Sequence, residues 1–513
     1  MLERREQFGN GADRFAEPPW QGQSDEWLQL DERLPLDHLA RQIEEAAEQL
    51  DLVPLMESYA GVGKEAHRPD LMVKIMLYEI RSQRLSPAQW AKDVKENEPL
   101  RWLSRGIEPS RTCLYKFRDR VAPYVDDWNA SVLRLAVERD LTTARRGALD
   151  GTFVDASASR RQLANEERLD QRRRTVQAAL NERPTEEERP AWLASTFQGL
   201  MNQKERYDRA DEILQQRLEQ NEGRQSSKRK PREKVLVSLT DPESALGRDK
   251  LGVFRPLFNV QLMCDLDSPL VLAYDTFATT HDAGMVGPML QRTMDLAGCK
   301  LDKLLADSGY VSLRDLESCS AADAKLFAPW RENDYSCQQG KKKAGNQFTQ
   351  IPKTEFEWLE EEQTYACPEG HHLKFWRQKK EPRLDYEITL RMYTCPAEHC
   401  CGCSRQTQCT PNPQKGRTVS RMQNEELLDE LRERMETTEA KALYKLRSQT
   451  VELAYADMKE HRGLRRFRSR SLRRAKTQVG LAVLTHNLLT VQHALAKPTA
   501  RQSPAEPSLV AAA

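Results

Sequence analysis

Three acidic residues of this chain have the type and the placement to hold divalent metal ions. Asp150 precedes a glycine, Asp307 lies in LLADSGYVS, and Glu452 lies on an apolar helical face. Carboxylate oxygens are the ligands that Mg²⁺ prefers, and two such ions can activate a water or a 3′-hydroxyl and stabilise the leaving oxygen. A zinc hydrolase would want histidines, which are absent from these positions. The predicted chemistry is metal-dependent phosphodiester cleavage.

A dense run of basic residues follows Glu452 and indicates a polyanionic substrate. From Arg462 to Lys476 the chain carries eight basic residues and no acid. Lys459 and this run are expected to hold the phosphate backbone of DNA, mainly without reading its sequence. The predicted contacts within the run are Arg462, Arg465, Arg466 and Arg468.

Distant segments must converge if the three acids are to form one site. Residues 145–157 are predicted to form a strand, and residues 302–312 a later strand that ends on Asp307. Because side chains alternate along a strand, Asp150 and Asp155 should point to opposite faces, so that only one of them lines a given site. We choose Asp150, since the glycine after it lets a ligand approach the backbone closely. The alternative is an ordinary strand-end aspartate.

The surrounding segments predict an α/β fold. Strand-like stretches at 234–241, 256–266 and 269–279 are followed by a helix at 282–297, and a helix and a strand follow Asp307. This order predicts a mixed sheet flanked by helices, with ligands collecting at the carboxyl ends of its strands. A final helix over 471–495 carries His486 on its core stripe, so we expect a core histidine there rather than a catalytic base.

The length of 513 residues predicts two or three domains with insertions. We expect a flexible arm at 1–36 and a helical DNA-binding domain at 37–140. In that domain a basic third helix begins at Ser110 and leaves Arg111 and Lys116 outside its apolar stripe. Such a helix is typical of a helix-turn-helix-like DNA reader, and the alternative is a small bundle with a basic surface.

The catalytic core is predicted to be discontinuous. It should comprise 141–330 and 438–496, with a helical hairpin inserted at 160–233 and a cysteine-rich insertion at 331–437. The Pro- and Ala-rich tail, 497–513, is expected to be disordered.

Cysteine spacing in the second insertion predicts a small zinc-ribbon-like unit. Cys400 and Cys403 are separated by two residues, which lets two thiolates grip one tetrahedral zinc, and Cys367 and Cys409 could complete four structural ligands. Unliganded thiols and an iron–sulfur cluster remain alternatives. Other side chains could replace any of the four, namely Cys395, Cys401, His371, His372 and His399.

Composition limits the location and the partners. Net charge is only +1, so DNA binding must come from local patches rather than from a global field. The amino terminus lacks the apolar core of a secretion signal, and no run approaches the length of a membrane span, so we expect a cytoplasmic protein with no membrane partner.

Several of these blocks together resemble a known family. The chain is similar to bacterial insertion-sequence transposases of the DDE superfamily, in the subgroup with a cysteine-rich insertion before the catalytic glutamate. The resemblance covers ALDGTFVDASAS, LLADSGYVS and TVELAYADMKEHRGLRRF, with the helical region from HRPDLMVKIMLYEIRSQ onward, and LTHNLL near the end. Tyr444, Arg447, Glu452 and Lys459 resemble a Tyr–Arg–Glu–Lys signature of related transposases, although four residues rather than the usual three separate Arg447 from Glu452.

The resemblance implies an RNase H-like core in which Asp150, Asp307 and Glu452 are catalytic ligands of Mg²⁺ or Mn²⁺, with Arg447 at the DNA. It also implies cleavage at transposon ends, strand transfer into target DNA and a homodimer or higher oligomer on the bacterial nucleoid. Asp155 is acidic where the family pattern leads us to expect a neutral or basic residue, so it stays an alternative first ligand. The rival functions are an RNase H-like nuclease without strand transfer and a zinc-stabilised, non-catalytic DNA-binding protein.

Overall fold

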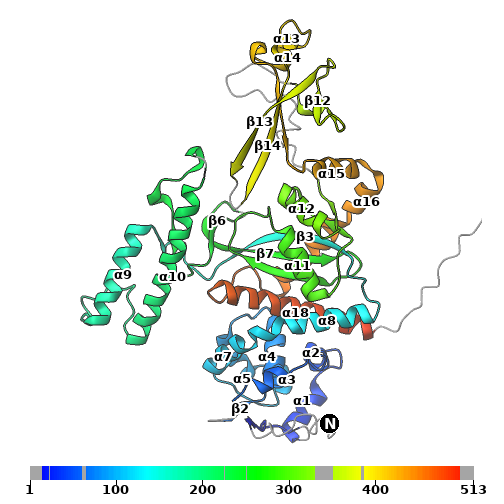
Figure 1. Cartoon of the computed structure of the whole chain (residues 1–513). Helices are drawn as coiled ribbons and strands as arrows, with labels where there is room; N and C mark the ends of the chain where they lie inside the picture. The colour runs from blue at the N-terminus through cyan, green and yellow to red at the C-terminus, as the bar shows by residue number, and fades with distance from the viewer. Residues whose placement is uncertain are drawn as a thin grey trace, which may run out of the picture.

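A mixed sheet of six strands lies at the centre of the protein (Figure 1). The structure is a computed structural model, and it describes residues 14–21, 24–60, 65–224, 226–249, 251–329, 351–382 and 386–496. The expected mixed α/β organisation is confirmed. The predicted disordered tail, 497–513, lies outside the described residues.

The sheet is parallel on one side of its central strand and antiparallel on the other. The strands are β10 (Lys325–Phe327), β9 (Lys303–Leu305), β3 (Arg146–Asp155) and β7 (Phe254–Asp265) in that order, with β8 (Val271–Phe277) and β6 (Ala245–Arg248) both paired to β7. β3 pairs in parallel with β9, and β9 with β10. The β3–β7, β7–β8 and β6–β7 pairs are antiparallel. The carboxyl ends of β3, β9 and β10 therefore face the same edge.

Helices from both halves of the chain cover this sheet. α11 (Val286–Ala297) packs on β8, and α17 (Leu446–Ala456) packs on β3 and β7. α12 (Leu313–Ala321) packs on α11 and β10, while α18 (Leu472–Ala496) packs on β8 and on α8 (Val125–Glu138).

The length and composition of α18 correct one expectation from the sequence. This helix is long and apolar enough to cross a bilayer. Most of its side chains are buried in the fold, however, between β8 and the helices of the N-terminal region. Its apolar character is therefore that of a core helix, which passes the same length and hydropathy test.

The N-terminal region is helical and shares one hydrophobic core with the sheet. Its elements are β1 (Phe15–Ala16), α1 (Asp25–Arg33), α2 (Leu39–Ala47), α3 (Val53–Glu57), β2 (Ala66–His67), α4 (Pro69–Arg81), α5 (Pro87–Glu96), α6 (Glu98–Leu103) and α7 (Arg111–Val121). The flexible arm predicted for 1–36 is wrong for its second half. α1 buries Leu30, and its Trp27 ring stacks on Trp102 with centroids 5.6 Å apart. These contacts offset the conformational entropy that the segment loses when it becomes ordered.

Glu79 is a buried acid on α4 that makes the stability of this region depend on pH. Burial, and then the charge of Asp93, raises the pKa of Glu79 to about 8, although Arg84 opposes the rise. Because the pKa in the folded state exceeds that in the unfolded state, the folded protein binds the proton more tightly and loses stability as pH rises from the unfolded value toward 8. Glu79→Gln should therefore stabilise the protein by about 1–3 kcal/mol at pH 8 and by much less at pH 5. Thermal unfolding at both pH values measures this, and equal effects at both would contradict it.

A helical hairpin projects from the core (Figure 1). It consists of α9 (Glu166–Asn181) and α10 (Phe197–Glu222), the pair expected at 160–233, and it has its own hydrophobic core. The strand expected at 234–241 does not join the central sheet. Only β5 (Val237–Ser238) forms there, and it pairs with β4 (Leu163–Ala164), because Val235, Val237 and Leu239 pack into the core of the hairpin. β6 lies in the central sheet instead.

A second projection is a separate antiparallel sheet with its own core. Its strands are β11 (Glu357–Leu359), β12 (Thr364–Ala366), β13 (His372–Pro382), β14 (Glu387–Thr394) and β15 (Thr418–Met422), paired in that order, with α13 (Ala397–Cys400) and α14 (Gln406–Cys409) at the far end of the β13–β14 ribbon. The chain then returns through α15 (Glu426–Glu436) and α16 (Thr438–Tyr444). α15 packs on α12 and β10, so the core resumes before residue 438.

Candidate active site

Asp150 and Asp307 lie side by side at the carboxyl edge of the two central parallel strands. The β3–β9 register pairs Ala148 with Leu305, and each aspartate lies two residues beyond its member of that pair. The Arg447 guanidinium of α17 lies between the two carboxylates, with Nη2 3.1 Å from Asp150 Oδ1 and 4.0 Å from Asp307 Oδ2. The arrangement concentrates two negative charges around one position that already accepts a cation.

Backbone amides fix both carboxylates. Asp307 is the N-cap of a 3₁₀ turn at Ser308–Tyr310, and its Oδ1 accepts a hydrogen bond from Gly309 N at 2.6 Å. Asp150 Oδ1 accepts from Gly151 N at 2.9 Å. Burial raises the pKa of Asp150, and the charge of Asp307 raises it further, whereas Arg447 and the Gly151 amide oppose the rise.

Asp282 is another acid at this site, and sequence reasoning missed it. It lies in the turn between β8 and α11, where its Oδ1 accepts from Asn259 Nδ2 at 2.9 Å and from Gln261 Nε2 at 2.8 Å. Its negative charge also raises the pKa of Asp150. The signal in the sequence is FNVQLMCD, where two fully buried amides interrupt an otherwise apolar strand.

Gly151 keeps space for these groups. A Cβ at this position would lie 2.2 Å from Gln261 Nε2 and 2.6 Å from Asp282 Oδ1. Gly151→Ala should therefore displace the amide pair and reduce catalytic activity, with a loss of stability of about 1–3 kcal/mol. Denaturant unfolding and an activity assay measure the two effects. The matched control is Gly223→Ala, whose Cβ would meet no atom closer than 3.7 Å and whose φ of −68° suits alanine. Full activity in Gly151→Ala would show that a Cβ at this position does not disturb Gln261 and Asp282.

The helix α17 attaches directly to the first strand. The Tyr455 hydroxyl donates to Asp150 O at 2.6 Å and lies 3.1 Å from Val260 O, and Lys459 Nζ donates to Thr152 Oγ1 at 2.6 Å. A π-helical turn at Asp457–His461 follows α17. In that turn Asp457 accepts from His486 Nδ1 at 2.9 Å, so His486 is a partnered residue of the packed helix α18.

Glu452 differs from the two aspartates in its surroundings. It is exposed on α17, five residues after Arg447 and three before Tyr455. On a helix it lies roughly 140° from Arg447 and roughly 60° from Tyr455, at the flank of the face that meets the acids. Among the residues that the structure describes, no group of three or more acidic side chains is arranged to hold a metal ion. The structure thus brings Asp150 and Asp307 together but not Glu452.

The basic residues predicted to bind DNA divide into exposed and buried ones. Residues 464–470 run beside the end of β3, where Phe467 N donates to Asp155 O, and Leu464, Phe467 and Ser469 are buried. The intervening Arg465, Arg466 and Arg468 are exposed. Arg462 does not fit the prediction, because it is 4% exposed and its Nε pairs with Asp457 at 3.1 Å. Burial lowers the pKa of Arg462 to about 10.

Two further predicted DNA contacts lie on α7. Arg111 and Lys116 are both exposed there, and Ser110 caps the helix by accepting from Cys113 N. Arg474, at the start of α18, pairs with Asp119 of α7 at 2.6 Å. This ion pair joins α7 to the end of the basic run. Asp155, the alternative first ligand, pairs instead with Arg255.

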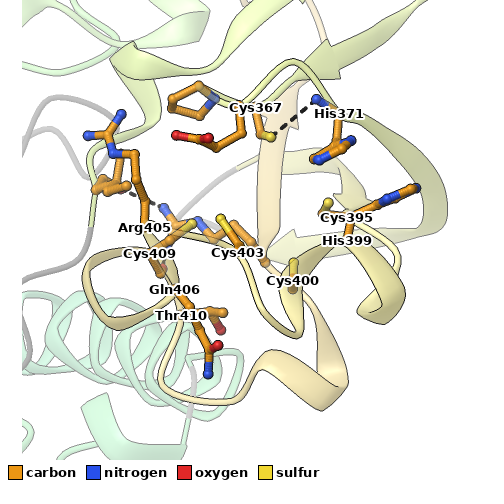
Figure 2. Close-up of a pocket in the computed structure, with 14 residues that line it drawn as sticks. Cys367, His371, Cys395, His399, Cys400, Cys403, Arg405, Gln406, Cys409 and Thr410 are labelled. Carbon is orange, nitrogen blue, oxygen red and sulfur yellow. Dashed lines mark hydrogen bonds between the residues drawn. The ribbon is translucent and has the colours of Figure 1, made fainter.

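The predicted zinc ligands Cys367, Cys400, Cys403 and Cys409 line one cavity at the end of the second projection, together with Cys395 (Figure 2). Cys401 is exposed. His371 and His399 line the same cavity with their rings stacked at 4.3 Å between centroids. The cavity is separate from the acidic site.

Comparison with protein families finds two matches, one near each end of the chain. The family described as Transposase domain (DUF772) matches residues 28–120, and the family described as Transposase DDE domain matches residues 366–491. The chain is a DNA transposase of the DDE type. No curated protein and no solved structure matches it.

The two matches cover different parts of the transposase. The first spans the helical region from α1 to α7, including Arg111 and Lys116. The second begins in the sheet that carries the cysteines and extends through Glu452 and the basic run into α18. Asp150 and Asp307 lie outside both matches, so their assignment rests on the geometry described above.

Proposed function

We propose that this transposase cleaves DNA at the ends of an insertion sequence and transfers the resulting strands into target DNA. The observation that carries the proposal is the meeting of Asp150 and Asp307 at one sheet edge, beside the helix that bears Glu452. These three residues are the proposed catalytic acids. We also propose that the protein acts in the cytoplasm, on the nucleoid. A homodimer or higher oligomer would hold the two DNA ends.

An RNase H-like core is the architecture that we infer. It is supported by the strand order β8-β7-β3-β9-β10, in which three antiparallel strands are followed by two parallel ones. In this arrangement the first acid lies on the central strand and the second follows the neighbouring parallel strand. The glutamate comes from a helix much later in the chain, which the insertions separate from the two aspartates.

The donor set fits Mg²⁺ or Mn²⁺. The oxygens of Asp150, Asp307 and Glu452 would hold such ions, and the guanidinium between the two aspartates marks a position that accommodates positive charge. When bound, the ions would supply an activated water or 3′-hydroxyl and stabilise the leaving oxygen. Arg447 lies between the two aspartates and Lys459 contacts Thr152, two residues beyond Asp150, so both would orient the DNA phosphate.

The exposed arginines of residues 465–470 and the outer face of α7 form the proposed path of the DNA backbone. Arg468→Ala should reduce the slope of log K against log salt by about 0.9, because one phosphate contact is lost, and should weaken binding to all duplex sequences similarly. Fluorescence anisotropy over a range of KCl concentrations measures both. Arg183→Ala, an exposed arginine of the hairpin loop, is the matched control. An unchanged slope for Arg468→Ala would remove this residue from the path.

A strand-transfer assay tests the function itself. Inverted repeats in the DNA that flanks the gene supply the end sequence for a duplex oligonucleotide, which is incubated with the protein, Mg²⁺ and a target plasmid. We expect cleaved ends and products joined to the plasmid. Cleavage without joined products would favour the RNase H-like nuclease. DNA binding without any cleavage would favour the non-catalytic DNA-binding protein.

A further inference from the structure

We propose that the second projection contains a structural Zn²⁺ site formed by the thiolates of Cys367, Cys400, Cys403 and Cys409, with Cys395 outside the coordination shell as a hydrogen-bond donor. Cys367 comes from one turn and the other four side chains from residues 395–409, and together they line one cavity of about 20 Å³ (Figure 2). The site is independent of the acids and of the proposed strand transfer.

Two of the ligands begin turns that are closed by backbone hydrogen bonds. In the turn that begins at Cys367, Gly370 N donates to Cys367 O, and His371 N donates to Cys367 Sγ at 3.4 Å. An amide that donates to sulfur favours the thiolate, the form that binds metal. In the second turn Cys403 N approaches Cys400 O at 3.5 Å. Gly370 and Gly402 have φ values of +78° and +91°, which side chains other than that of glycine rarely adopt.

A buried arginine supplies independent support. Arg417 lines the cavity and is 7% exposed, but its side chain donates only to the backbone oxygens Cys409 O at 3.3 Å and Ile351 O at 2.8 Å, while its Nε has no partner. Among the described residues, no carboxylate pairs with it. Its guanidinium lies over the Phe356 ring at 5.3 Å, and a negative charge nearby would further offset the cost of burying this cation. A Zn²⁺ ion with four thiolates carries a net charge of −2 and would provide it.

Five cysteines compete for four tetrahedral positions, and their surroundings separate Cys395 from the others. Cys395 is 2% exposed at the end of β14, and its backbone is held by Cys395 N donating to Arg417 O at 2.8 Å. Its side chain lines the same cavity as that of Cys400. Cys403 is paired with Cys400 by the two-residue spacing that lets both sulfurs reach one ion, whereas Cys395 directly follows β14 and is separated from Cys400 by four residues. A thiol that donates to a ligating sulfur supports the ligand without becoming one.

The metal would close the far end of the β13–β14 ribbon. The apolar core of this projection is small, comprising Ile351, Phe356, Tyr365, Leu373, Tyr393 and Val419 besides the cysteines. A small core of this kind gains much of its stability from a bound metal. The thiols release protons as zinc binds, so zinc affinity should rise with pH.

Metal analysis of the purified full chain tests the site. We expect about one zinc per chain and no visible absorption, since zinc has no redox or d–d bands. Cobalt(II) loaded in place of zinc should give the intense absorption of a tetrahedral four-thiolate site. Cys403→Ser should lose the metal, and Cys403→His should retain it with an altered cobalt spectrum, because histidine nitrogen is also a ligand. Retention by the histidine variant distinguishes ligation from a purely structural thiol even if the serine variant folds poorly.

Two further variants decide the role of Cys395. Cys395→Ser should keep one zinc per chain and bind it roughly 10- to 100-fold more weakly in competition with a chromogenic chelator. Cys401→Ser, which changes an exposed neighbour in the same turn, is the matched control and should bind zinc like the unmodified protein. The proposal is overturned if Cys395→Ser loses the metal while Cys403→Ser retains it. It is equally overturned if the protein takes up no zinc, or if it contains iron with visible charge-transfer absorption.

Discussion

Asp307→Asn is expected to abolish DNA cleavage by this transposase while leaving the fold and DNA binding intact. Asparagine can still accept the hydrogen bond from Gly309 N through its side-chain oxygen, so the 3₁₀ turn should persist. The charge that would hold a divalent ion is lost, however. Losing several kcal/mol of transition-state stabilisation lowers the cleavage rate by a factor on the order of 10³ or more.

The rate of single-turnover cleavage of an end-bearing duplex measures this effect, and anisotropy with the same duplex measures binding. Asp302→Asn is the matched control, since Asp302 precedes the same strand but pairs with Arg145 at an exposed position. Cleavage by Asp307→Asn within tenfold of the control would show that the carboxylate at the strand end is not catalytic.

Glu452→Gln is expected to reduce cleavage by a similar factor, on the order of 10³-fold. The residue lies on the helix that supplies Arg447 and Tyr455 to the first acid, but its own side chain is exposed. Because an exposed carboxylate contributes little to folding, this substitution should leave thermal stability unchanged. A slower cleavage rate could then not be attributed to partial unfolding of the variant.

Glu460→Gln provides the comparison for this second variant. Glu460 is an exposed glutamate in the turn after the same helix, and it pairs with Arg465. Its replacement should preserve cleavage. If Glu452→Gln cleaves as fast as Glu460→Gln, the third acid must be sought elsewhere, and Asp282 is the nearest candidate, because its charge already acts on Asp150.

The part of the site that follows from local sequence is the pair of aspartates. Asp150 lies within one apolar strand and Asp307 just beyond another, and parallel pairing of these strands brings the two residues together. Asp282 lacks such a local signature, because it lies in a turn and its surroundings come from the amides of Asn259 and Gln261 on a different strand. The orientation of Glu452 also escapes prediction, since a helical period gives angles within a helix but not the face that meets the sheet.

Hydrophobic periodicity predicted where helices and strands form better than it predicted what they pack against. The apolar alternation at 234–241 is real, but its side chains fill the core of the hairpin rather than that of the sheet. Arg462 shows the same limit for charge, because its position in a basic run gives no sign that Asp457 holds it in the interior. In both cases a long-range contact outweighs the local pattern.

The hydrogen bond from Tyr455 to the Asp150 carbonyl bears on which segments of the chain can change in length during evolution. The helix α17 is anchored directly to β3 and β7, which lie far from it in the sequence. Segments between them can therefore gain or lose length, or be exchanged outright, without altering the spacing of the reactive groups.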